Sequence, residues 1–283
     1  MKNFNPGSMV DTKRPYDFAN ISFLFLTPIV GFGVGSWYIL NYGITWLEIL
    51  NCFIMYMLTG IGITAGYHRY YAHRTYDCAG FLKAYYLLFG AAAAQNSVLN
   101  WSSDHRYHHR FVDTDADPYN VKRGGLWAHV GWIFYKNTEN DEVRYKNVPD
   151  LLKDRWILWQ HRWYIAILAV VSFGLPAAVG LLEGRPWGGL LWGGFIRVVL
   201  VHHTTFFINS LAHTSAFGAK QHFSDHHTSF DSPFLALLTV GEGYHNFHHE
   251  FAHDYRNGIK WYHYDPTKWF IRTCEILGFA SNL

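Results

Sequence analysis

Four long runs of apolar residues dominate the pattern of the chain. They cover residues 21–40, 46–66, 164–182 and 188–209, and each is close to the roughly 20 residues that a helix needs to cross a bilayer. Only short connections with polar or turn-forming residues separate the first run from the second and the third from the fourth. The pattern therefore predicts four transmembrane helices arranged as two hairpins.

A fifth stretch, residues 81–99, is apolar but interrupted by Lys83, Gln95 and Asn96. The charges help to place it: of the 23 Lys and Arg, 13 fall in 67–163, five in 213–283 and three before residue 20. The positive-inside rule then puts both termini and the segment 67–163 in the cytoplasm. We therefore expect 81–99 to lie at the membrane interface or against the polar part of the molecule.

The composition agrees with a membrane protein that also carries a polar part. Half of the residues are hydrophobic and 16% are charged, whereas soluble domains have about 25% charged residues. The net charge of +2 gives no sign of nucleic-acid binding. The three cysteines are widely spaced, which argues against a zinc ribbon or a disulfide framework. The first twenty residues show no signal peptide.

We expect one all-α integral-membrane domain over 1–283. In this interpretation the four spanning helices carry a cytoplasmic helical cap, formed by 67–163 and 210–283.

Half of the eighteen histidines form a pattern. They lie in four short sequences: HRYYAH (His68, His73), HRYHH (His105, His108, His109), NSLAH (His213) and HNFHH (His245, His248, His249). The first and third sequences follow the second and fourth predicted spans, and the others lie in the polar segments. With the predicted topology, all of them converge on the cytoplasmic face.

Helical spacing gives this pattern a physical meaning. Positions i, i+3 and i+4 share one helix face, so each HxxHH sequence places three imidazoles together. Neighbours such as His108 and His109 diverge by about 100°, so one can serve one metal and the other a second. His68 and His73 are five apart, lie off a single narrow face and could also divide between two sites. Nine imidazoles therefore predict two metals with four or five ligands each.

The spacing does not select the metal, because imidazole suits iron, zinc, copper and nickel. No cysteine lies in these sequences, as it often does in structural zinc sites, and redox iron is our preferred interpretation. A polar patch would explain a single HxxHH sequence but not four converging ones. HFSDHH (His222, His226, His227) imitates the pattern, and we interpret it as a loop feature.

Four carboxylates stand beside these sequences: Asp104, Asp113, Asp117 and Glu242. A metal-bound histidine usually donates its other ring N–H to a carboxylate or carbonyl. We expect these side chains to orient the histidines, with helix capping as the alternative role.

The chain resembles the membrane fatty acid desaturase family, and is most similar to the acyl-CoA (stearoyl-CoA, Δ9-type) desaturases and their bacterial relatives. The resemblance runs from the second span to about residue 270. It rests on the histidine sequences together with DTDADPYN, HVGW (129–132), NSLAH and GEGYHNFHH (241–249). It implies a di-iron centre in which the nine histidines bind two iron ions, with Asn209 reaching one of them through water.

The resemblance also implies an activity. Such an enzyme uses O2 and two electrons to remove two hydrogens from a saturated acyl chain, leaving a cis double bond, here expected at Δ9. Breaking an unactivated C–H bond needs an oxidant that side chains cannot supply. The acyl chain would be held in a bent tunnel, and Trp101, Thr205 and Phe206 fall at the family's tunnel positions. Ordinary core packing is the alternative for these three.

Two departures concern the head group of the substrate. Ser103 and the pair Lys136-Asn137 stand where animal acyl-CoA enzymes place arginine and Arg-Lys, which contact the CoA phosphates. Four other cations are candidates to make these contacts instead: Lys122, Arg123, Arg144 and Lys146. The substrate is therefore left open between acyl-CoA, an acyl-lipid and a carrier-protein ester.

No haem-binding HPGG motif occurs in the chain. We therefore expect electrons from a separate ferredoxin, rubredoxin or cytochrome b5, and a location in a bacterial inner membrane.

Three alternatives remain open at this point. A membrane di-iron hydroxylase or other lipid oxygenase would tolerate the same spacing. A membrane zinc hydrolase or metal sensor would bind zinc and consume no O2. A scaffold without catalysis would tolerate loss of His108 or His248.

Overall fold

The computed structural model describes residues 14–137 and 141–283. Within this part of the chain, four helices are long and apolar enough to cross a membrane: Phe18–Tyr42, Trp46–Ala72, Tyr164–Glu183 and Pro186–His213. This confirms the expectation of four such helices and extends each beyond its predicted limits. The apolar runs stop short of one end of the second and third helices and of both ends of the first and fourth, because those ends continue into less apolar sequence.

Each of these four helices changes from α to π geometry along its length. The first consists of α1 (Phe18–Pro28), a π-helical segment (Ile29–Val34) and α2 (Gly35–Tyr42). The second joins α3 (Trp46–Ile61) to the π-helical Gly62–Ala72. The third joins α9 (Tyr164–Ile167), π-helical Leu168–Gly174 and α10 (Leu175–Gly180), and the fourth joins α11 (Pro186–Gly189), π-helical Leu190–Ile196 and α12 (Arg197–Ser210).

Shorter elements make up most of the rest. The helices are α4 (Gly80–Ala92), α5 (Val98–Phe111), α6 (Gly125–His129), α7 (Asp141–Arg144), α8 (Arg155–Arg162), α13 (Pro233–Leu238), α14 (His245–Glu250) and α15 (Pro266–Ile276). Single 3₁₀ turns occupy Val121–Arg123, Gly131–Phe134, Leu151–Lys153, Leu181–Glu183, Leu211–His213 and Ala216–Gly218. Strand β1 (Asp77–Cys78) pairs antiparallel with β2 (Ala280–Ser281), with Asp77 opposite Ser281.

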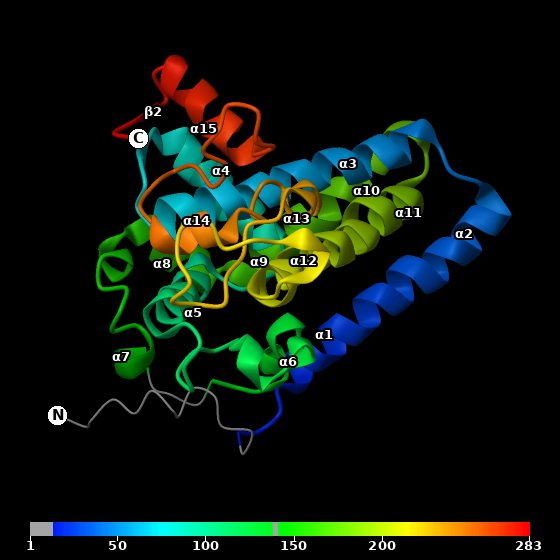
Figure 1. Cartoon of the computed structure of the whole chain (residues 1–283). Coiled ribbons are helices and arrows are strands. Elements are labelled where there is room, and N and C mark those ends of the chain that lie inside the picture. Colours follow the sequence, from blue (N-terminus) through cyan, green and yellow to red (C-terminus); the bar gives the residue numbers. More distant parts are fainter. Residues whose placement is uncertain (1–13, 138–140) are drawn as a thin grey trace.

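The long helices lie side by side, and the shorter ones gather toward one end of them (Figure 1). The second long helix packs against the fourth, which also contacts the third and the first. The connections between α2 and α3 and between α10 and α11 lie at the opposite end (Figure 1). His68, His73 and His213 therefore stand at the end of the long helices where α5 and α14 also lie.

The buried carboxylate of Glu48 links the helix connections at the opposite end. Thr45 and Glu48 form a reciprocal capping box at the start of α3, which satisfies two backbone N–H groups. Glu48 also accepts hydrogen bonds from the Arg185 guanidinium at 2.8 Å and from the Tyr38 hydroxyl at 3.1 Å. An acidic residue at the start of an apolar helix is therefore paired across the connections of three long helices.

The stretch 81–99 does not form one helix. The helix α4 ends at Ala92, and Ala94 and Asn96 have φ angles of 59° and 78°, so the backbone turns before α5 begins. Its 13 residues rise about 20 Å at 1.5 Å per residue, which is less than the roughly 30 Å hydrocarbon core. The helix α4 is therefore too short to span a membrane alone, and it packs against the π-helical segments of the second and third long helices.

A buried arginine holds the end of α4 in place. The Arg197 guanidinium donates to the carbonyls of Ala92 at 2.7 Å, Ser172 at 2.9 Å and Gly193 at 3.0 Å. The Ala92 carbonyl lies in the last turn of α4, where carbonyls have no intrahelical partner, and the carbonyls of Ser172 and Gly193 have a second lone pair with which to accept. Arg197 thus joins three helices and fixes where the 93–97 turn begins.

Close packing of α4 on the second long helix depends on two glycines. A Cβ atom added to Gly66 would lie 2.5 Å from the Cβ of Tyr86, and one added to Gly90 would lie 2.2 Å from the Tyr67 ring. Both tyrosine side chains are fully buried and have little room to move.

We expect Gly66→Ala and Gly90→Ala to destabilise the protein by about 1–3 kcal/mol each, because added methyl groups overpack this interface. Thermal unfolding in detergent micelles measures the effect. Gly33→Ala is the matched control, since a Cβ there meets nothing within 4 Å. Equal melting temperatures for Gly66→Ala and Gly33→Ala would contradict the packing argument.

Candidate metal centre

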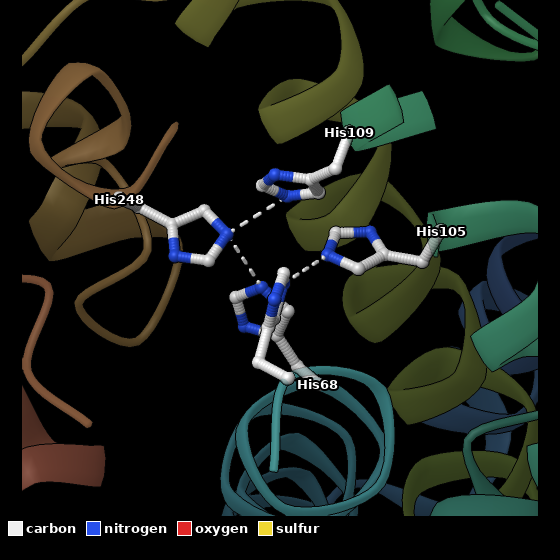
Figure 2. Close-up of side chains that lie close together, drawn as sticks. His68, His105, His109 and His248 are labelled. Atoms are coloured by element: carbon white, nitrogen blue, oxygen red, sulfur yellow. Dashed lines mark hydrogen bonds between the residues drawn. The ribbon is translucent and has the colours of Figure 1, made fainter. Parts of the chain in front are cut away.

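All nine histidines singled out from the sequence come together in two groups. One contains His68, His73, His105, His109 and His248, and the other contains His108, His213, His245 and His249. Within each group, one ring nitrogen of every member lies within 4.8 Å of the others. Seven of the nine are buried, whereas His109 and His249 are partly exposed. Figure 2 shows four members of the larger group with their rings turned toward one another.

Adjacent histidines serve different groups. On α5, His108 belongs to the smaller group and His109 to the larger, and on α14 His249 and His248 divide in the same way. This is the division that a helical rotation of about 100° per residue predicts. Asp231 sets the start of α14, because its carboxylate accepts the backbone N–H of Asn246 at 2.8 Å and of Phe247 at 3.1 Å.

His68 and His73 do not divide between the groups. Both belong to the larger one, and their ring centroids are 4.9 Å apart. The cause is local: the backbone N–H of His73 donates to the carbonyl of His68 at 3.0 Å, an i to i+5 hydrogen bond of a π-helix. This wider turn brings residues five apart onto one side, which an α-helical projection does not predict.

The spacing of the Nε2 atoms fits a metal ion. Six Nε2–Nε2 distances, three within each group, lie between 2.8 and 3.2 Å. Two imidazole nitrogens bound at right angles to one metal at about 2.1 Å would be about 3.0 Å apart. Converging nitrogen atoms at these distances therefore form a donor set with the dimensions of a coordination site.

The electrostatics of the site favour neutral imidazole, the form that binds metals. Burial, and then the neighbouring histidines, hold the pKa of the group members outside the long helices well below the ordinary value of histidine. These are His73, His105, His109, His245, His248 and His249.

Carboxylates orient one histidine in each group directly. The Nδ1 atom of His68 lies 3.0 Å from the Glu242 carboxylate, and the Nδ1 atom of His108 lies 2.9 Å from Asp117. Donation from Nδ1–H leaves the Nε2 lone pair free to face the centre. Glu242 and Asp117 are two of the four carboxylates that the sequence predicts to orient histidines.

Asp113 orients a histidine indirectly, through the hydroxyl of a threonine. The Thr228 hydroxyl donates to Asp113 at 2.6 Å and accepts from Nδ1 of His213, which is 3.1 Å away. Sequence reasoning did not identify Thr228, because it is 115 residues from Asp113 along the chain.

Asp104 is not bonded to any histidine within the described residues. Its carboxylate lies 4.0 Å from Arg144, and Nδ1 of His105 instead faces the Tyr119 hydroxyl at 3.3 Å. Asp104 precedes His105 on α5, so its side chain points to another side of the helix.

A buried ionic network supports the larger group. The sequence predicts Glu242 but not its pairing with Arg69 and Asp265. The Arg69 guanidinium donates to Glu242 at 2.8 Å and to Asp265, the N-cap residue of α15, at 3.0 Å. Asn257 also donates to Glu242. Burial raises the pKa of Glu242, but Arg69 and His68 outweigh it and lower the pKa to about 2. The carboxylate that orients His68 is therefore charged.

Arg106 has a similar role on α5. It donates to the carbonyls of Tyr71 and Ala72, both at 2.8 Å, and makes a bidentate pair with Asp150 at 2.7 and 2.8 Å. These carbonyls end the second long helix and have no helical partner. Arg106 thereby fixes the position of α5 relative to His73. In the sequence, only the position of Arg106 between His105 and His108 indicates this role.

A cavity of about 680 Å³ adjoins both groups. Members of the larger group (His68, His105) and of the smaller group (His108, His245) line it. The positions expected in a tunnel, Trp101, Thr205 and Phe206, line the same cavity, as does Asn209.

Gln95, which the sequence did not single out as a site residue, also lines this cavity. Gln95 donates to the Thr205 hydroxyl at 2.8 Å and accepts from the Trp101 indole N–H at 3.2 Å. The 93–97 turn, α5 and α12 are therefore linked at the cavity wall. Its apolar lining from the long helices includes Phe23, Leu24, Tyr56, Leu168 and Val201.

Comparison with known proteins identifies the family. The family model described as fatty acid desaturase matches residues 44–275, a range that contains all nine histidines and most of the chain. The chain belongs to the fatty acid desaturase family. This confirms the resemblance inferred from the histidine sequences.

Several curated proteins are similar to this family member. A probable acyl-CoA desaturase of Schizosaccharomyces pombe is 45% identical over 231 residues, covering 81% of this chain and 47% of that protein. Acyl-CoA desaturase 1 of Saccharomyces cerevisiae is 40% identical over 93% of this chain and 52% of its own length. The sn-1 stearoyl-lipid 9-desaturase of Synechocystis is 34% identical over 84% and 72%. The chain thus spans about half the length of the two yeast relatives.

The cations expected near the head group of a desaturase substrate are only partly brought together. Lys136 and Arg144 line the cavity, together with Arg14. Arg123 instead stacks on Trp127, 4.0 Å from the ring centroid, and the Lys122 ammonium lies 3.4 Å from the carbonyl of Asp113.

Ser103, which stands where arginine was expected, is fully buried. Its hydroxyl donates to the carbonyl of Arg144 at 2.6 Å and contacts Asn147 at 2.9 Å. The serine therefore anchors the segment that carries Arg144.

We expect Asp117→Asn to weaken metal binding by the smaller group about 10- to 100-fold, the usual effect of losing such a partner. The Asp117 carboxylate accepts from His108 and from Tyr119 N–H on one oxygen and from Asp113 N–H on the other. Either orientation of an asparagine amide therefore sets its NH2 group against an N–H donor.

Metal content per chain after dialysis, determined by plasma mass spectrometry, checks this prediction. The exposed Asp115, changed to Asn, is the control and should retain full metal content. Full retention by Asp117→Asn as well would refute the role given to the carboxylate.

Proposed function

We propose that this chain is an O2-dependent fatty acyl desaturase that introduces a cis double bond, at Δ9, into a saturated acyl chain. One observation carries the proposal: histidines of both groups open onto the same largely apolar cavity, in a chain of the fatty acid desaturase family.

The two groups are proposed to hold two iron ions, with five and four histidines as ligands and Asn209 reaching one ion through water. Imidazole is a suitable ligand for iron. When bound, the metal pair supplies the oxidising power that side chains lack. The overall reaction balances: the acyl chain loses two hydrogens, two further electrons and two protons enter, and O2 leaves as two molecules of water.

The residues of the chain have the task of positioning. In this proposal the acyl chain lies in the cavity, and the linked Trp101, Gln95 and Thr205 side chains hold it at the turn between α4 and α5. Trp101 also stacks on His105, with ring centroids 4.8 Å apart, so the same indole contacts the histidine group and the cavity. Holding one methylene pair near the centre fixes the position of the double bond.

The polar end of the cavity is proposed to take the head group. Arg14, Lys136 and Arg144 provide positive charge there, with Lys122 and Arg123 farther out on the Val121–Arg123 turn. Cationic side chains suit the phosphates of CoA or of a phospholipid. Relatives carry both kinds of name, acyl-CoA desaturase in yeast and stearoyl-lipid 9-desaturase in Synechocystis, so acyl-CoA and acyl-lipid are the two candidate substrates.

The setting proposed for the enzyme is a bilayer, the bacterial inner membrane, with the long helices as two hairpins. The histidine end, with its cap of shorter helices, and the C-terminus would face the cytoplasm, where a ferredoxin, rubredoxin or cytochrome b5 supplies electrons. The excess of Lys and Arg in 67–163 supports this orientation. The N-terminus, predicted on the same side, begins outside the described residues.

The direct test is expression in a host that lacks its own desaturase but has an electron donor, followed by mass spectrometry of its fatty acids. We expect one new double bond at a fixed position. His108→Ala and His248→Ala should abolish it, whereas His226→Ala, a change at a residue with a 90% exposed side chain, should not.

Other outcomes select other functions. Hydroxylated acyl chains would favour a lipid oxygenase. Zinc as the sole bound metal, with unchanged lipids and no O2 consumption, would refute the desaturase proposal.

We expect Gln95→Ala to lower desaturation roughly 100-fold, because a chain displaced by about 1 Å leaves the reactive geometry. The residual product should include double bonds at neighbouring positions, which mass spectrometry of derivatised fatty acids detects. Metal content should stay at the wild-type level, since the side chain of Gln95 bonds to Thr205 and Trp101 and not to a histidine among the described residues. A product of unchanged amount and position would show that Gln95 does not hold the substrate.

A further inference from the structure

A tenth histidine stands beside the smaller group. His227 belongs to HFSDHH, which was interpreted as a loop feature, and its ring centroid lies 5.2 Å from that of His249. Its neighbour His226 has a side chain that is 90% exposed, whereas His227 is partly buried. Two adjacent histidines of one loop therefore differ in burial and in what they face.

The His227 ring is held in a defined orientation. Its Nδ1 atom pairs with the Ser229 hydroxyl at 2.7 Å, and Ser229 is fully buried. The carbonyl of Ser229 accepts from the side chain of Asn246 at 3.0 Å. Since Asn246 lies on α14 between His245 and His248, the loop is tied to the helix that supplies three members of the centre.

The other ring nitrogen of His227 is shielded from solvent. Its Nε2 atom is buried and, among the described residues, has no hydrogen-bond partner. A buried polar atom without a partner is costly, so such an atom in a native structure calls for an explanation. A ligand at the adjoining metal centre would provide the partner that the protein does not.

The place that His227 occupies is the exposed side of the centre. His109 and His249, the two partly exposed members, stack on each other there with centroids 4.3 Å apart and planes at 14°. His227 lies against His249 but belongs to neither group of converging nitrogens. It therefore stands outside the ligand positions and beside a partly exposed member of the centre.

We propose that His227 is an outer histidine that closes the exposed side of the metal centre and slows the loss of metal from the group His108, His213, His245 and His249. The inference rests on the proposed metal centre and adds to it a residue outside the nine. It assigns to the HFSDHH loop a role in metal retention.

The experiment compares purified wild type, His227→Ala, His227→Gln and His226→Ala. Each is loaded with Fe(II) without oxygen and then mixed with a strong iron chelator. The iron remaining on the chain is followed over time by plasma mass spectrometry. The smaller group is proposed to hold one of the two iron ions, which is about half of the iron. We expect His227→Ala to release this half at least ten-fold faster than wild type, in the range known for residues that support metal ligands.

The other variants separate retention from structure. His226→Ala should release iron at the wild-type rate, and His227→Gln, which keeps a polar group near the Nε2 position, should restore much of the retention. The melting temperature of the metal-free proteins should be the same for wild type and His227→Ala, because the proposed role exists only with metal present.

Three results would overturn the inference. His227→Ala could release iron at the wild-type rate, or His226→Ala could release it as fast as His227→Ala does. The third is a melting temperature of metal-free His227→Ala below that of the metal-free wild type. If the wild type holds iron and His227→Ala releases it at the same rate, this inference alone is rejected. A wild type that binds no iron rejects the proposed function with it.

Discussion

The buried contact between Arg69 and its two carboxylates is the interaction on which the centre depends. Glu242 and Asp265 are 173 and 196 residues from Arg69 along the chain, and the three charged groups have almost no exposure. Removing one partner of a buried pair leaves an uncompensated charge and costs about 3–5 kcal/mol. The network joins the second long helix to the loop before α14 and to the start of α15, so it sets the distance between His68 and His248.

The same network decides which ring nitrogen faces the centre. Glu242 accepts from His68 because Arg69 keeps the carboxylate charged, and Asp117 and the Thr228–Asp113 pair act on the smaller group in the same way. The charged side chains thus lie outside the ring of imidazoles and the neutral nitrogens inside. A metal cation in the middle would meet donors already turned toward it, which reduces the cost of ordering them.

The sequence predicts the contents of the centre better than its supports. Spacing on α5 and α14 follows from regular helix geometry, so His108 and His109 divide as expected. The pairing of His68 with His73 could not be predicted in this way, because it depends on a π-helical turn. Thr228 and Asp265 carry no local signal, since their partners Asp113 and Arg69 are 115 and 196 residues away. The turn within 81–99 was missed because positive φ at Ala94 and Asn96 leaves little trace in composition.

The distribution of the nine histidines along the chain has a consequence for biosynthesis. The larger group needs residues from 68 to 248 and the smaller group residues from 108 to 249, so neither is complete until α14 has been made. A nascent chain that ends before the third long helix, at residue 163, offers five of the nine imidazoles. A complete donor set for either group therefore exists only after the last long helix and α14 have been made, and a chain truncated before His245 lacks members of both groups.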